Sequence, residues 1–269
     1  MPELPEVETV KNTLKNIVLG KKIIASNIYW NNIIAYPTPE EFKKQIKNQT
    51  INDIKRRGKW LMFELDDYFL LSHLRMEGKY FFKHKEDPLN KHDHVTFTFN
   101  DGTELRYNDT RKFGKMYLLK KEIASSVKPL SELGLEPWDK NLTPEYLKTK
   151  LKSKPIKSEL LDQSIIVGIG NIYADEILFL SKINPEAKSS QIPKVKLQAI
   201  IDNTRKVLGE AINYGGTTIK SYESSEGVHG RFQNKLLVHT KEICPSCGAK
   251  INKITIGGRS TYYCPKCQK

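Results

Sequence analysis

The chain has 269 residues and carries 44 Lys and Arg against 31 Asp and Glu, which gives a formal net charge of +13 and a pI near 9.4. This surplus implies a polyanionic partner, nucleic acid first and an anionic membrane surface second. No apolar run approaches the roughly 18 residues of a spanning helix, and the acidic start MPELPEVE excludes a basic secretory signal. We therefore expect a cytosolic protein, long enough for two ordinary domains.

The chain begins MPELPEVETV, with a proline directly behind the initiator methionine. If that methionine is removed, the ring nitrogen of Pro2 becomes a secondary amine at the terminus. An α-amine titrates about 2.5 units below a lysine, so more of it is uncharged near neutral pH and able to attack a carbon. The simpler interpretation is a proline that starts a helix. Val7, Val10 and Leu14 recur at helical spacing, which predicts a helix to about Gly20.

Residues 22–121 are rich in β-branched and aromatic side chains. The segments KIIASNIYW, WLMFEL, YFLLSHL, VTFTF, ELRY and KMYLL predict strands. Asn100-Asp101-Gly102, between VTFTF and ELRY, is typical of a hairpin turn. This half is therefore predicted to be mainly antiparallel β, a sandwich or a barrel with a helix against it.

After a connector around residues 129–141, the pattern becomes helical. Thr143-Pro144-Glu145 predicts the start of a helix through about Leu151, and further helices are predicted over 160–167, 172–183 and 195–212. Gly215-Gly216 ends the last of them.

The segment Gly168-Ile169-Gly170-Asn171 lies between two of these helices. Backbone N–H groups at a helix start can bind a phosphate oxygen. As a dinucleotide motif the segment is weak, because no predicted strand precedes it and the third glycine is missing. Taken alone, it favours a simple turn between helices.

All four cysteines lie near the end of the chain. Cys244 and Cys247 form one CxxC pair and Cys264 and Cys267 another, sixteen residues apart, which is the spacing of a tetrahedral zinc site. The sequence between the pairs predicts a β-hairpin with its turn at Gly257-Gly258. Four thiolates leave no open coordination position, so we expect one structural zinc ion. Arg259 follows the turn, where it is either solvated or placed to contact phosphate.

Two segments, His73–Gly78 and Asp109–Gly114, place cationic and large apolar side chains beside a glycine at predicted strand ends. Such apolar residues usually belong to the core. On exposed loops of a basic protein they would serve as wedges between base steps, with an arginine filling the place of an extruded base. The basic run Lys55–Lys59 is most simply a solvated face, but Lys59 adjoins the apolar segment WLMFEL and is expected to be partly buried.

Taken together, MPELPEVETV, RRGKW, SHLRMEGKY, KHDH, DTRKFG, GIGNIYADE and CPSC…GGRSTYYCPKCQ resemble, in their order and spacing, the bacterial formamidopyrimidine-DNA glycosylases. That family removes 8-oxoguanine and ring-opened purines from DNA. The resemblance implies an α+β fold in three parts. These are an N-terminal antiparallel β-sandwich with a helix (residues 1–130), a helical helix-two-turns-helix DNA-binding domain (131–220), and a lesion loop with a zinc-ribbon β-hairpin (221–269). DNA would lie between the domains.

The resemblance also assigns catalytic residues. With Met1 removed, Pro2 would attack C1′ of the damaged nucleotide and form an imine-type intermediate. Glu3 would assist sugar opening and proton transfer, and Glu6 would lie in the same pocket. Lys59 corresponds to the lysine linked to β-elimination, and Arg259 to the hairpin arginine that grips phosphate and is linked to δ-elimination. The implied product is a gapped strand.

The resemblance implies DNA contacts as well: His92, Arg111 and Lys152 to the backbone, Lys157 and Asn171 as phosphate clamps, and Met76, Arg111 and Phe113 in the void left by the flipped base. Residues 217–230 fall where the family has a mobile loop that closes over the lesion. The segment before Cys244 is two residues shorter than is common in the family. The implied partner is double-stranded DNA with oxidised purines or abasic sites, bound by a monomer.

Two alternatives stay open on the sequence. The endonuclease VIII branch of the same superfamily prefers oxidised pyrimidines, although the PELPE start and the DTRKFG segment favour the purine branch. A non-catalytic zinc-ribbon DNA-binding protein would account for the charge and the four cysteines. Such a binder would form no covalent adduct that borohydride can trap.

Overall fold

The structure, a computed structural model, describes residues 1–217 and 230–269. The chain divides into two compact units: the first contains Met1–Pro2 and Glu6–Ser131, and the second contains Glu3–Pro5, Glu132–Thr217 and Arg231–Lys269. Most of the predicted lesion loop, residues 218–229, lies outside the described residues. The three-part division with boundaries after residues 130 and 220 stays a prediction.

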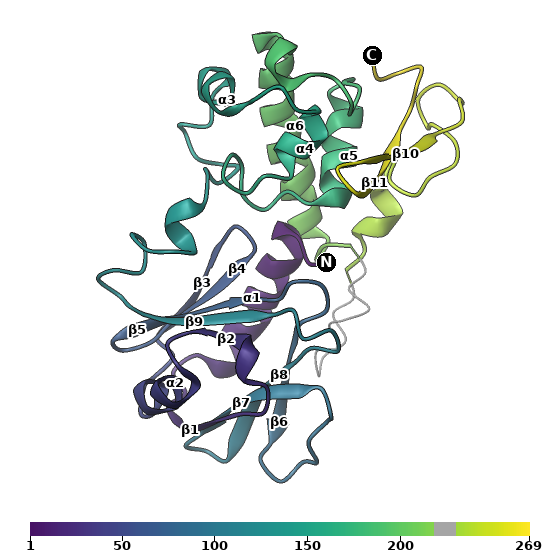
Figure 1. Ribbon diagram of the computed structural model, residues 1–269. Helices are drawn as coiled ribbons and strands as arrows, with labels where there is room; N and C mark the ends of the chain where they lie inside the picture. Colours follow the sequence, from purple (N-terminus) through teal and green to yellow (C-terminus); the bar gives the residue numbers. More distant parts are fainter. Residues whose placement is uncertain (218–229) are drawn as a thin grey trace. The chain divides into compact units, whose positions relative to one another are not determined.

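The first unit is a sandwich of two sheets (Figure 1). One sheet has the strand order β1 (Ile23–Ile28), β7 (Asp93–Phe99), β8 (Thr103–Asn108), β6 (Lys79–His84). The other has the order β2 (Ile34–Tyr36), β9 (Lys115–Lys120), β5 (Tyr68–His73), β4 (Trp60–Glu64), β3 (Asp53–Arg57). Neighbouring strands are antiparallel except β2 and β9, which are parallel. The unit also contains the short helix η1 (Asn31–Ile33), α2 (Pro39–Ile46) and all but the first residues of α1 (Leu4–Val18).

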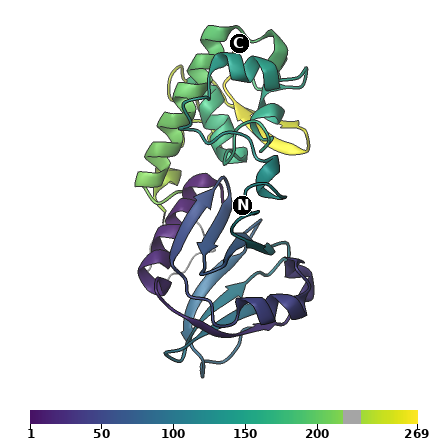
Figure 2. The same cartoon turned by 90° about the vertical axis from the view of Figure 1, so that its left-hand side faces the viewer.

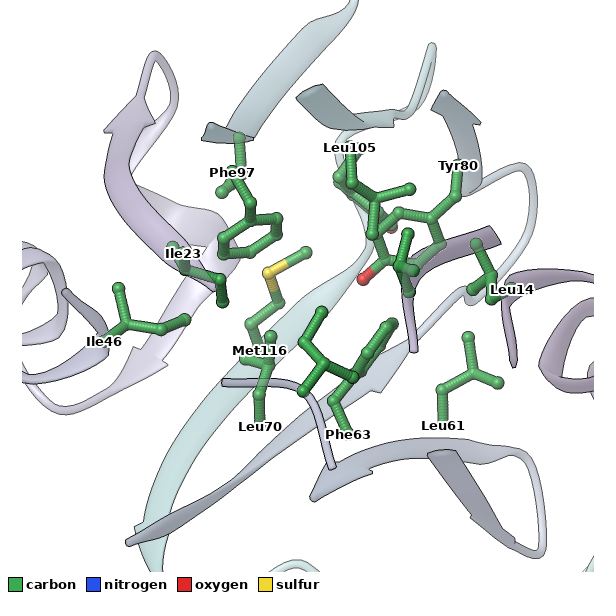
Figure 3. Close-up of a cluster of buried hydrophobic side chains, with 14 of the residues drawn as sticks. Leu14, Ile23, Ile46, Leu61, Phe63, Leu70, Tyr80, Phe97, Leu105 and Met116 are labelled. Atoms are coloured by element: carbon green, nitrogen blue, oxygen red, sulfur yellow. The ribbon is translucent and has the colours of Figure 1, made fainter. Parts of the chain in front are cut away.

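The inner faces of both sheets meet in one hydrophobic core (Figure 3). This cluster contains the side chains of Leu61 and Phe63 from β4, Phe97 from β7, Leu105 from β8 and Leu14 from α1. Alternate residues of a strand face the same side of its sheet, which is why Leu61 and Phe63 are both buried. Full burial of a side chain of this size contributes about 1.5–3 kcal/mol, so this core holds the sandwich together.

The strands predicted in this half are present, and the β7–β8 hairpin turns at Gly102, whose φ is +80°. The prediction missed β2, β3, β6 and α2. The start of α2 does carry a sequence signal, because Thr38 and Glu41 form a capping box and Pro39 occupies the first turn.

The second unit contains α3 (Pro144–Lys150), α4 (Ile156–Leu160), α5 (Asn171–Leu180), α6 (Lys194–Asn213), the hairpin β10 (Asn252–Ile256) and β11 (Arg259–Tyr263), and the short helices η3 (Ser189–Gln191) and η4 (Phe232–Lys235). The short helix η2 (Leu130–Glu132) spans the boundary between the two units. α5 is the central element of the second unit, with Tyr173, Ile177 and Leu178 wholly buried. Figures 1 and 2 show α6 and the hairpin on either side of α5. α4, α6 and β11 are therefore held in place by their packing against α5.

The helix predicted over residues 160–167 is wrong, because α4 ends at Leu160 and turns follow. The side chain of Gln163 accepts the N–H of Gly168 and donates to the carbonyls of Leu161 and Ile169. Such side-chain bonds to nearby backbone compete with a helix. The segment therefore forms a loop, and its apolar side chains are buried.

The α+β fold class, with its N-terminal β-sandwich, helical domain and C-terminal hairpin, is confirmed. Within the part of the chain that the structure describes, no helix combines the length and the apolar character needed to cross a membrane.

Candidate catalytic and DNA-binding site

The carboxylate of Glu3 caps the N-terminus of α5. Its Oε2 accepts the N–H of Gly170 at 2.7 Å and that of Tyr173 at 3.4 Å, and its Oε1 accepts the N–H of Ile172 at 2.9 Å. A helix start has unpaired N–H groups and the positive end of the helix dipole, both of which favour an anion. The buried Glu3 is therefore fixed in place as a carboxylate at this helix end.

Two glycines allow Glu3 and Leu4 to lie this close to the start of α5. A Cβ on Gly170 would lie less than 3.0 Å from the Glu3 side chain, and one on Gly168 would collide with Leu4. Gly168 also has a φ of +92°, and its carbonyl accepts the Leu4 N–H at 3.0 Å. The Gly168–Asn171 segment is thus a helix start, and its N–H groups hold a carboxylate of the same chain.

The hairpin strand β11 is docked against α4 and α5 through a buried polar network. The wholly buried ammonium of Lys157 lies 2.7 Å from Oδ1 of Asp175. It also donates to the Ser260 carbonyl at 3.1 Å and to the Thr261 hydroxyl at 2.9 Å. Burial lowers the pKa of Lys157, and the Asp175 charge opposes that shift. A phosphate contact by Lys157 would require its ammonium to leave this network.

Asn171 adds a further bond to the same strand, because its Nδ2 donates to the Ser260 carbonyl at 2.9 Å. Arg259, the residue before Ser260, is exposed and pairs with Ile256 across the turn. The turn lies at Gly257-Gly258, whose φ values are +54° and +75°, as predicted. Glu3, Asn171 and the backbone beside Arg259 are therefore all anchored at one end of α5.

Asp175 and Glu176 were not singled out from the sequence, yet they organise this region. Oδ2 of Asp175 lies 2.7 Å from Nδ1 of His239 and accepts the N–H of Tyr262 at 3.2 Å. The Glu176 carboxylate accepts three N–H groups, those of Leu237, Val238 and His239. Burial raises the pKa of Glu176, and these three bonds oppose the rise. Adjacent acids inside the apolar run NIYADEILFL were the available signal, because buried charges need partners.

The four cysteines form the predicted metal site. Their sulfurs lie within 4.8 Å of one another, with Cys244 Sγ 3.8 Å from Cys267 Sγ and Cys247 Sγ 3.5 Å from Cys264 Sγ. Zinc–sulfur bonds of about 2.3 Å in a tetrahedron place sulfurs about 3.8 Å apart. The site therefore fits one structural zinc ion, with no position left for substrate.

Lys59 and His73 lie together at one end of the five-stranded sheet. Lys59 is only 5 % exposed, which confirms the predicted burial. The pKa of His73 is lowered to about 3, chiefly by burial and further by the charges of Arg75 and Lys59. Nδ1 of His73 accepts the Arg75 N–H at 3.0 Å, so the neutral ring carries its proton on Nε2. Lys59 is thus a buried lysine beside an uncharged imidazole.

The two predicted wedge segments form loops outside the core. Phe113 is 50 % exposed and Met76 is partly exposed. The guanidinium carbon of Arg111 lies 4.8 Å from the Phe113 ring centroid, a cation–π arrangement that holds the two side chains together. Phe113 is therefore not a core residue.

The remaining predicted residues are placed as follows. Pro2 and Glu6 are buried, Lys152 is exposed, and His92 is partly exposed with its ring 6.4 Å from that of His94. The Lys152 backbone is fixed because its N–H donates to Glu159 at 2.9 Å. The DNA and catalytic roles of all these residues stay predictions.

Family models match three parts of the chain. Residues 1–116 match the formamidopyrimidine-DNA glycosylase N-terminal domain, residues 133–223 match the formamidopyrimidine-DNA glycosylase H2TH domain, and residues 241–269 match a zinc finger found in FPG and IleRS. The matched segments fall on the sandwich, the helical region and the cysteine hairpin.

Whole proteins and solved structures agree with these matches. The chain is 48 % identical to the formamidopyrimidine-DNA glycosylase of Bacillus subtilis (strain 168) and 47 % identical to that of Bacillus anthracis, with 100 % of this chain and 99 % of each relative covered. A Lactococcus lactis Fpg complex with abasic-site DNA is 40 % identical, with a TM-score of 0.92 and 99 % of both chains covered. The wild-type Lactococcus lactis Fpg with DNA containing N7-benzyl-Fapy-dG is 41 % identical, with a TM-score of 0.92 and 100 % of both chains covered. The chain belongs to the formamidopyrimidine-DNA glycosylase family of zinc-containing DNA-repair enzymes.

Proposed function

We propose that the chain excises oxidised purines from duplex DNA through Pro2 and then cleaves the strand by β- and δ-elimination. The observation that carries this assignment is the Glu3 cap on α5, with bonds of 2.7 and 2.9 Å to Gly170 and Ile172. A catalytic carboxylate must be held in a productive position, since misplacement by about 1 Å can cost 10²-fold in rate. Glu3 follows the proposed nucleophile directly in the chain.

In the proposed reaction the Pro2 nitrogen forms a bond to C1′ while the bond from C1′ to the damaged base breaks. The departing base takes up a proton, and the sugar ring opens to leave an iminium between Pro2 and C1′. Glu3 is the carboxylic group nearest to Pro2 along the chain, and it is assigned to proton transfer during ring opening. As a carboxylate, Glu3 would take up the proton that the Pro2 nitrogen loses on attack and pass it to the sugar oxygen as the ring opens. General acid–base help of this kind is typically worth about 10²–10⁴-fold.

Strand cleavage is assigned to Lys59 and Arg259. Removal of a proton from C2′ of the iminium expels the 3′ phosphate, and a second elimination expels the 5′ phosphate. A buried lysine such as Lys59, 5 % exposed, suits a proton-transfer role because it is shielded from bulk water. The exposed Arg259 on a metal-fixed hairpin suits a phosphate grip.

The proposed partner is duplex DNA that contains an oxidised purine or an abasic site. The net charge of +13 supports it, as do the exposed cations Arg111, Lys152 and Arg259. The solved relatives hold DNA with an abasic site and DNA with N7-benzyl-Fapy-dG. We further propose that the protein acts as a monomer in the cytoplasm and associates with the nucleoid through DNA.

Borohydride trapping tests the proposal. Protein verified to begin at Pro2 is mixed with duplexes that contain 8-oxoguanine, an oxidised pyrimidine or no damage, and the matched control is protein that retains Met1, whose Pro2 nitrogen is an amide. The expected result is a covalent adduct on 8-oxoguanine DNA with the processed protein alone. Preferential trapping on the oxidised pyrimidine would favour the endonuclease VIII branch, and no adduct on any duplex would contradict the proposal.

A further inference from the structure

The two wedge segments form loops, termed the wedge loops, that run next to each other from one sheet to the other. Residues 74–78 connect β5 to β6, and residues 109–114 connect β8 to β9. β5 pairs with β9 in one sheet, and β6 pairs with β8 in the other. The His73–Lys115 and Lys79–Asn108 pairs stand at the loop ends. Each sheet therefore holds one end of both loops, and the loops must run next to each other.

The hydroxyl of Tyr107, on β8, lies between the glycines that close the two loops. A Cβ on Gly78 or on Gly114 would lie less than 3.0 Å from this one oxygen. Tyr107 is wholly buried, and its ring lies 5.3 Å from that of Tyr80 in an edge-on arrangement. The phenol thus touches both loop backbones from the core side and cannot move without displacing one of them.

Asp109, the first residue of the second loop, fixes the backbone that carries Arg111 and Phe113. Its Oδ1 accepts the Arg111 N–H at 3.0 Å and its Oδ2 accepts the Gly114 N–H at 2.8 Å. The Tyr107 hydroxyl donates to the same Oδ2 over a longer 3.4 Å. Asp109 is wholly buried, so water does not compete for these bonds.

A second link joins the loops at the surface, where the Thr110 hydroxyl donates to Oε2 of Glu77 at 2.6 Å. Glu77 is the neighbour of Met76, and Thr110 is the neighbour of Arg111. Arg75 and Lys112 have φ values of +53° and +58°, a left-handed conformation that non-glycine residues rarely adopt. Both loops therefore hold an uncommon backbone shape that the surrounding bonds must maintain.

We propose that Tyr107, Asp109 and the Thr110–Glu77 bond are positioning elements that join the loops of Met76 and Phe113 into one rigid wedge for base extrusion. The inference rests on the proposed function and adds residues to which the family resemblance gave no role. Its physical basis is preorganisation, because side chains that are already ordered do not have to be ordered when DNA binds. Tyr107 and Asp109 touch no DNA in this scheme and act through Met76, Arg111 and Phe113.

The test compares Tyr107→Phe and Thr110→Val with matched controls. Tyr80→Phe removes another buried tyrosine hydroxyl, one that donates to Ser72 at 2.7 Å, and Thr103→Val removes a hydroxyl bonded to Asp101 at the opposite end of β8. Thr110 is exposed, so its variant stays informative if Tyr107→Phe fails to fold. Single-turnover rates are measured on an 8-oxoguanine duplex and on a single-stranded abasic substrate, which has no base to extrude.

We expect Tyr107→Phe to slow duplex cutting by about 10-fold and Thr110→Val by a few-fold, with single-stranded abasic cleavage and both controls within about 2-fold of wild type. Adding Tyr107→Phe to Phe113→Ala should cause a smaller loss than Tyr107→Phe causes in wild type, since part of the effect of the hydroxyl is exerted through Phe113. Any of three results would overturn the inference. These are losses that multiply in the double variant, equal losses on both substrates, and duplex cutting at the wild-type rate by both Tyr107→Phe and Thr110→Val. If wild type itself fails to form the borohydride adduct, the proposed function fails instead.

Discussion

The Glu3 carboxylate and the Gly170 N–H are joined by a 2.7 Å hydrogen bond, which ties the residue after the proposed nucleophile to the N-cap of α5. The same helix start carries Asn171, whose amide holds the hairpin strand next to Arg259. One helix end thus orders residues that are 256 positions apart in the chain, Glu3 and Arg259. Because the two residues lie so far apart in the chain, no local sequence pattern indicates this link.

Gly170→Ala should move Glu3. The added Cβ would lie less than 3.0 Å from Glu3 atoms, while the φ of −129° suits any residue, so the effect is steric and not backbone strain. We expect 8-oxoguanine excision to slow by about 10²-fold. The control is Gly209→Ala in α6, where the nearest atom is 4.0 Å away and helix stability should rise slightly. Equal single-turnover rates for Gly170→Ala and wild type would show that the position of Glu3 is not critical.

Glu3→Gln should separate base release from strand cleavage. Glutamine keeps the shape but cannot transfer a proton as a carboxyl group does, so excision of 8-oxoguanine should fall by about 10²–10⁴-fold. A preformed abasic site has no base to expel, and its cleavage should fall much less. Because the new amide also faces the N–H groups of α5, DNA affinity and zinc content are measured as controls. If the rates on both substrates fall by the same factor, Glu3 acts in the imine chemistry that the two reactions share.

Asp175→Asn should loosen the hairpin. It leaves the wholly buried Lys157 ammonium, now 2.7 Å from a carboxylate, beside a neutral amide. Removing one partner of a buried ion pair costs about 3–5 kcal/mol of unfolding free energy, and δ-elimination should fall relative to β-elimination as Arg259 loses its fixed position. Asp162→Asn, at a turn where the carboxylate accepts the Ser164 N–H and hydroxyl, is the control with a small expected effect. An unchanged denaturation midpoint and product ratio would contradict this role for Asp175.

His73 should make the protein less stable in mild acid. Its pKa is about 3 in the folded chain against 6.5 for an ordinary histidine, so below pH 6.5 the unfolded chain gains a proton that the folded chain excludes. Stability is therefore lost as the pH falls from 6.5 toward 3, at about 1.4 kcal/mol per unit. Between pH 7 and pH 5, wild type should lose about 2 kcal/mol more unfolding free energy than His73→Asn. Urea titrations at both pH values measure this, and identical losses in the two proteins would show that His73 does not titrate as described.

Much of the fold was predictable because it follows from local patterns. Strands β1, β4, β5, β7, β8 and β9, the β7–β8 turn and the cysteine hairpin have period-two alternation, turn residues or metal spacing. The failure over residues 160–167 has a different origin. There the apolar residues suit a helix, but Gln163 bonds the backbone and the segment is buried by tertiary packing.

Motif order and spacing were enough to nominate Glu3, Lys59, Arg259 and the cysteines, but not the residues that hold them. Asp175, Glu176 and Tyr107 act through partners far along the chain or through a close approach to glycine. No periodicity encodes such contacts. Likewise, the Gly168–Asn171 segment taken alone favoured a simple turn between helices, and only the fold shows that its N–H groups hold the Glu3 carboxylate.

The identity of the residue that bonds to C1′ is the most direct test of the proposed mechanism. Protein verified to begin at Pro2 is trapped with borohydride on an 8-oxoguanine duplex and digested, and the DNA-linked peptide is sequenced by mass spectrometry. The predicted adduct lies on the nitrogen of Pro2, in the peptide that starts at that residue. An adduct on a lysine such as Lys59, with Pro2 unmodified, would contradict the mechanism.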